Sequence, residues 1–121
     1  MGEIATSRRL ITIYYHPESI RAKKAIGYAK AEGLRLQKIN ILKTTLTGTQ
    51  ISEIADRLNL KIKDLVNQNH NAYRSIYEPS DLSSEDWIKL IQHHPEIMKQ
   101  PIAIQGKKTI LVETPSDIIK I

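Results

Sequence analysis

The chain contains no cysteine among its 121 residues. This absence excludes a disulfide framework, zinc sites built on thiolates and any reaction in which the chain supplies a thiolate nucleophile. Aromatic residues make up only 5% of the sequence, and phenylalanine is absent. No apolar run approaches the length of a membrane span, and the first residues lack the apolar stretch of a signal peptide. We therefore expect a cytoplasmic protein with no membrane partner.

Length and composition are those of an ordinary globular protein. Hydrophobic residues make up 40% of the chain and charged residues 26%, which is enough apolar material to bury a core without a disulfide or a metal. No repeat or low-complexity tract divides the sequence. We therefore expect residues 1–121 to form a single domain.

The net charge of +5 is unevenly distributed. Residues 1–43 carry +6 and the remainder carries −1. The positive charge of residues 1–43 could bind an acidic protein or nucleic acid. We prefer the simpler interpretation that these charges lie on a solvated helix face. The scarcity of aromatic residues also gives no pattern for stacking bases, so nucleic acid is not favoured as a partner.

Hydrophobic periodicity and turn residues predict the secondary structure. The predicted strands lie at 10–15, 34–42, 101–104 and 109–112, with a hairpin turn at 105–108; the predicted helices lie at 18–32, 47–58, 63–73 and 83–94, with a last one from 114. Gly33 is a helix stop, and Thr47 with Gln50 forms a capping box. Pro115 and Asp117 have the spacing of a helix start.

This order predicts an α/β fold with one four-stranded mixed sheet flanked by helices. A parallel β-α-β half precedes a helical insertion, and a β-hairpin and a short helix follow it. The arrangement resembles the thioredoxin fold with a helical insertion. Three stretches, 14–25, 60–74 and 94–102, resemble in order and spacing the segments that mark the family of arsenate reductases and Spx-type regulators.

The resemblance implies that the family's functional positions are altered in this chain. Ser19 falls in the slot of the nucleophilic cysteine, and Ala22 falls in the slot of the second, supporting residue. Asn69 and Gln100 fall where two arginines would hold the oxyanion, and Lys23 replaces the arginine at the helix start. Pro101 occupies the position at which thioredoxin-like folds place a cis proline beside the active-site loop, where backbone groups can meet an extended peptide.

These replacements remove the chemistry of arsenate reduction. The reaction needs a thiolate that attacks arsenic and then enters thiol–disulfide exchange, and a serine hydroxyl does neither. Amides offer dipoles where guanidinium groups offer charge and two parallel donors. We therefore expect no enzyme of the family's kind, no catalytic residue and no cofactor.

The spacing of the histidines in the sequence does not predict a metal site. His93 and His94 are adjacent on one predicted helix, so their side chains diverge by about 100°. His16 and His70 have no carboxylate at ligand spacing. Surface or capping roles are the better interpretation.

Two functional hypotheses follow. The first is a non-catalytic, arsenate-reductase-like protein that binds a protein and acts as a regulatory module; the Spx-type branch of the family, which contacts RNA polymerase, is its specific version. The alternative is a protein that binds a small anion or a thiol ligand, or a divergent enzyme of the reductase family, using the helix start at Ser19.

Overall fold

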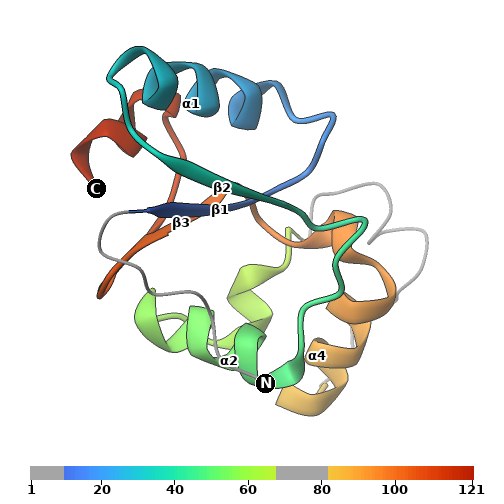
Figure 1. The fold of residues 1–121 in the computed structure, drawn as a ribbon. Helices are drawn as coiled ribbons and strands as arrows, with labels where there is room; N and C mark the ends of the chain where they lie inside the picture. The colour runs from blue at the N-terminus through green and yellow to red at the C-terminus, as the bar shows by residue number, and fades with distance from the viewer. Residues whose placement is uncertain (1–9, 68–81) are drawn as a thin grey trace. The chain divides into compact units, whose positions relative to one another are not determined.

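A computed structural model describes residues 10–67 and 82–121 (Figure 1). The chain divides into two compact units. Among the described residues, the sheet unit contains 10–44 and 100–121, and the helical unit contains 45–67 and 82–99. The sheet unit is therefore built from two segments that are distant in sequence, and the helical unit is inserted between them in the chain.

The sheet unit contains one four-stranded mixed sheet with the strand order β2-β1-β3-β4. Its strands are β1 (Ile11–Tyr15), β2 (Leu36–Asn40), β3 (Ile102–Gln105) and β4 (Lys108–Leu111). β1 pairs in parallel with β2 and antiparallel with β3, and β3 continues through a hairpin into β4. The mixed sheet predicted from the sequence is confirmed.

Helix α1 (Ile20–Ala31) connects the two parallel strands. Ser19 is its N-cap, and the Ser19 Oγ accepts a hydrogen bond of 3.1 Å from the backbone N–H of Ala22. The helix ends before Gly33, whose φ of +73° is accessible to glycine at little cost. These local signals explain why α1 begins and ends close to its predicted limits.

The core of the sheet unit lies between the sheet and α1. The C-terminal 3-10 helix η3 (Pro115–Lys120) also contributes to this core. The buried side chains of the core are all small or aliphatic: Ile11, Ile13, Ala25, Ala29, Ala103, Val112 and Ile118. Helices α1 and η3 contact each other and cover the same face of the sheet (Figure 1). Thr12 and Tyr14 belong to the opposite face of β1 and are also buried.

The helical unit contains α2 (Gly48–Arg57), η1 (Ile62–Leu65), α4 (Ser84–His93) and η2 (Pro95–Ile97). The capping box predicted for α2 is present: Gln50 N donates to Thr47 Oγ1 at 3.1 Å, and Thr47 N donates to Gln50 Oε1 at 2.9 Å. α2, η1 and α4 contact one another. None of the helices in the described part of the chain is long and apolar enough to span a membrane.

Over its described part, the helix predicted at 63–73 is present only at residues 63–65, as part of the 3-10 helix η1, and is wrong from Val66 onward. η1 ends at Leu65, and Val66 is extended and forms an isolated β-bridge with Met98. The Leu65 carbonyl accepts a hydrogen bond from Lys99 N, so a segment distant in sequence takes a backbone group that a continuing helix would use. Residues 68–73 of that prediction lie outside the described residues.

Candidate functional site

The loop between β1 and α1 is organised by the backbone and the ring of His16. His16 N donates to Gln100 Oε1 at 3.1 Å, and the His16 carbonyl accepts from Ser19 N at 3.1 Å. The ring Nδ1 accepts from Glu18 N at 3.1 Å. An Nδ1 that accepts carries no proton, so the neutral ring in this arrangement has its proton on Nε2. His16 is therefore a local cap of the loop, as the sequence indicated.

Ser19 is half-buried at the N-terminus of α1, and its hydroxyl is already engaged. Besides the bond from Ala22 N to Ser19 Oγ, the Ser19 carbonyl accepts from Lys23 N at 3.0 Å. Both bonds are typical of an N-cap residue, whose side-chain oxygen accepts from a backbone N–H that has no partner within the helix. The geometry gives the Ser19 side chain a structural role.

Gln100 and Pro101 bring the start of β3 to the same loop. The Gln100 side chain bonds His16 across 84 positions of sequence. The Gln100–Pro101 peptide bond is cis, which confirms the prediction for this position. Pro101 is buried, and its carbonyl accepts from Val112 N at 2.9 Å. Three of the predicted positions, Ser19, Gln100 and Pro101, therefore belong to one hydrogen-bonded corner of the sheet unit.

The other predicted positions contribute differently. Ala22 is fully buried against the core, and the Lys23 side chain is exposed on α1. Asn69 lies outside the described residues. The described residues contain no group of three His, Cys, Asp or Glu side chains that could hold a metal ion.

Sequence reasoning missed the function of the Gln100 amide. In the arrangement that the resemblance implies, an arginine here would present a cation, but Gln100 uses its oxygen to accept a hydrogen bond, which a guanidinium cannot do. The signal in the sequence was the glutamine directly before Pro101. Its partner, a backbone N–H in a distant loop, is visible only in the structure.

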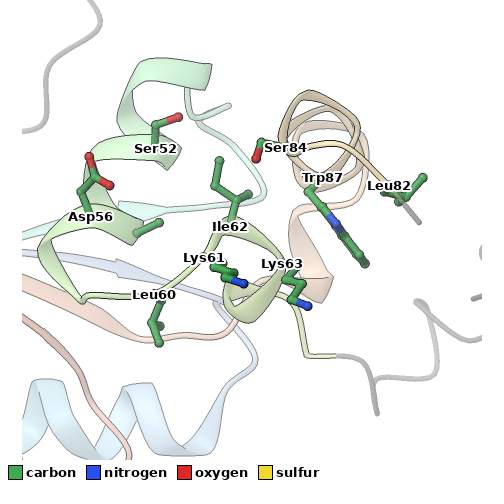
Figure 2. Close-up of a pocket in the computed structure, with 10 residues that line it drawn as sticks. Ser52, Asp56, Leu60, Lys61, Ile62, Lys63, Leu82, Ser84 and Trp87 are labelled. Carbon is green, nitrogen blue, oxygen red and sulfur yellow. The ribbon is translucent and has the colours of Figure 1, made fainter. Parts of the chain in front are cut away.

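A separate hollow of about 640 Å³ lies in the helical unit, among α2, η1 and α4. Figure 2 shows Ser52 and Asp56 on α2, and Ser84 and Trp87 on α4, with Ile62 of η1 in the same hollow. No histidine is among its described lining residues. Among these described lining residues, neither serine therefore has beside it the imidazole base that most often activates a serine nucleophile.

Residues 14–121 match the model of the ArsC family. The chain belongs to the ArsC family. The match covers the loop, α1 and the cis proline, so the corner described above lies within the part that defines the family.

Relatives of this ArsC-family chain include regulators. The global transcriptional regulator Spx 2 of Lactococcus lactis is 26% identical over 100 residues, which cover 82% of this chain and 76% of the relative. The regulatory protein MgsR of Bacillus subtilis is 16% identical over 112 residues, which cover 92% and 89% of the two chains.

Solved structures show the same fold. The arsenate reductase from Vibrio cholerae superimposes with a TM-score of 0.84 at 17% identity, covering 95% of this chain and 99% of that one. An arsenate reductase related protein from Brucella melitensis gives a TM-score of 0.69 at 19% identity over 96% and 94%. These similarities confirm the predicted thioredoxin-like arsenate reductase fold, and at this identity they concern the fold alone.

The bond between His16 and Gln100 can be tested by stability. Gln100→Met keeps a side chain of similar length but leaves the part-buried His16 N–H without its acceptor. We expect it to lower the free energy of unfolding by about 1–2 kcal/mol. Gln100→Glu keeps an acceptor oxygen and is the matched control, expected to lose clearly less. Guanidinium denaturation compares the two, and equal losses would show that the bond contributes nothing.

Proposed function

We propose that this ArsC-family protein is a non-catalytic regulator of the cytoplasm that acts by binding a protein partner. The proposal is supported by the sequence resemblance, which implies that Ser19, Ala22, Asn69 and Gln100 stand where a reductase of the family needs its cysteine, supporting residue and arginines. Lys23 and Pro101 complete the altered set. RNA polymerase is the specific partner that the Spx-type resemblance suggests, and regulators among the curated relatives support this version.

One observation carries the proposal: the polar side chains at two altered positions are neutral and already bonded within the chain. Ser19 Oγ caps α1, and Gln100 Oε1 accepts from His16 N. Groups with these partners contribute to holding the corner together. They provide neither a sulfur for exchange nor a positive charge for an oxyanion.

The alternative, a small-anion or thiol-ligand site at Ser19, has less support. Ser19 already satisfies the N–H of Ala22, and the nearby Gln100 is neutral. The only further support for an anion site is the N-terminus of α1, and every helix has such an N-terminus.

Direct binding to RNA polymerase tests the proposal. The purified chain is immobilised, and RNA polymerase holoenzyme from the same organism is passed over it at increasing concentration. We expect saturable binding with a Kd at or below about 1 µM, the affinity of an ordinary specific complex. Another purified multi-subunit complex of comparable acidity is the control. Equal binding to both, or none to the polymerase, contradicts this version of the function.

A further inference from the structure

Helix α1 exposes two of its three large apolar side chains and buries three of its alanines; the third large side chain, Ile26, is partly buried and packs against the core. Ile20 is 69% exposed and Tyr28 48% exposed, whereas Ala22, Ala25 and Ala29 are fully buried. A surface helix ordinarily turns its large apolar side chains toward the core. The two large side chains on the outside of α1 therefore contribute little to the stability of this chain.

These side chains belong to one continuous face. Ile20, Lys24 and Tyr28 are spaced four residues apart and so follow one another along the helix surface. Gly27 and Ala31 are also exposed and lie beside this row by helical position. We call the exposed residues Ile20, Lys24, Gly27, Tyr28 and Ala31 the α1 face.

Packing against residues 10–67 and 82–121 does not explain the glycine at position 27. A Cβ added there would meet nothing within 4 Å, and the position has no positive φ. Glycine in the middle of a helix is less stable than alanine. An open glycine between exposed apolar residues leaves room for a partner to approach the helix backbone closely.

The charge of α1 indicates the chemistry of that partner. The helix carries Arg21, Lys23, Lys24 and Lys30 and no acidic residue. None of these cations forms an ion pair with another residue in the described part of the chain. A symmetric contact between two copies would bring these cations face to face, and a nucleic-acid backbone would not need the apolar row.

We propose that the α1 face is the docking surface for an acidic protein partner, with Ile20 and Tyr28 as apolar anchors and the cations around them steering the encounter. The inference rests on the proposed function and says where its partner binds. Gly27 is the contact point at which side-chain volume is excluded.

Gly27→Ala separates binding from stability. We expect it to raise Tm by about 2–4 °C, since alanine stabilises an exposed helix, and yet to weaken binding to RNA polymerase holoenzyme at least tenfold. Ile20→Ser and Lys24→Glu should weaken binding to a similar extent. The matched controls, Leu42→Ser at an exposed leucine and Lys107→Glu at the hairpin turn, lie off α1 and should bind normally.

The outcomes distinguish this inference from the proposed function. If polymerase binds the parent chain and all five variants equally, the α1 face is refuted and the proposed function stands. If polymerase does not bind at all, the proposed function fails. The α1 face is then tested separately, with a photo-cross-linking residue placed at position 28 or at position 42 in living cells. A protein adduct from position 28 alone, lost with Gly27→Ala, supports the α1 face. The α1 face is overturned if neither position gives a protein adduct or if positions 28 and 42 give equal adducts. An adduct between position 28 and nucleic acid also overturns it.

Discussion

Ile13→Ala is expected to lower the free energy of unfolding by about 3–4 kcal/mol, within the range of about 2–5 kcal/mol for such truncations in a core. Ile13 is fully buried in β1, the strand that pairs with both β2 and β3. Its side chain belongs to the core under α1, where the neighbouring Ala25 and Ala29 are too small to fill the cavity that truncation would leave.

Ile119→Ala is the matched control for this prediction. Ile119 belongs to η3 and is 43% exposed, so the same change removes less buried surface. We expect a loss below about 1 kcal/mol. Urea denaturation of both variants measures the difference, and similar losses would contradict the assignment of Ile13 to the core.

The sequence predicted the elements whose boundaries depend on neighbours in the chain. Ser19 caps α1 and Gly33 ends it, and Thr47 with Gln50 begins α2. Each signal acts over about four residues, so the sequence alone contains it. The order of strands and helices then led to the correct sheet.

Prediction failed where the backbone partner lies far along the chain. Val66 pairs with Met98, and this contact ends the helical segment that the local pattern extended to residue 73. The bond from His16 N to Gln100 Oε1 was not predicted either, because its two partners are 84 positions apart in the sequence. Local propensity contains no information about either pairing.

The candidate site was predictable in position and less so in function. The sequence placed Ser19, Gln100 and Pro101 together through the family resemblance, and the structure shows Ser19 and Gln100 both bonded to His16. The sequence could not show that the Gln100 amide acts as an acceptor. Nor could it show that Ile20 faces solvent, because apolar residues occur on several sides of α1.

Ser19→Cys is expected to create a reactive thiol without creating a reductase. Backbone N–H groups at the start of α1 should hold the pKa of the introduced thiol below its ordinary value of about 8.5. Alkylation by iodoacetamide at pH 7 should then be faster than that of a thiol introduced at exposed Leu42. Arsenate turnover should stay absent, because Gln100 supplies no guanidinium and no second thiol stands at Ala22. Turnover in this variant would show that the arginine positions matter less than proposed.

The most direct test of the central claim is arsenate reduction by the unmodified chain. Arsenite formation is followed with glutathione and glutaredoxin, and separately with thioredoxin and its reductase, beside an active arsenate reductase as the positive control. The proposed function predicts no arsenite above the blank without protein, for the unmodified chain and for Ser19→Cys alike. Arsenite produced in proportion to the concentration of the unmodified chain would contradict it.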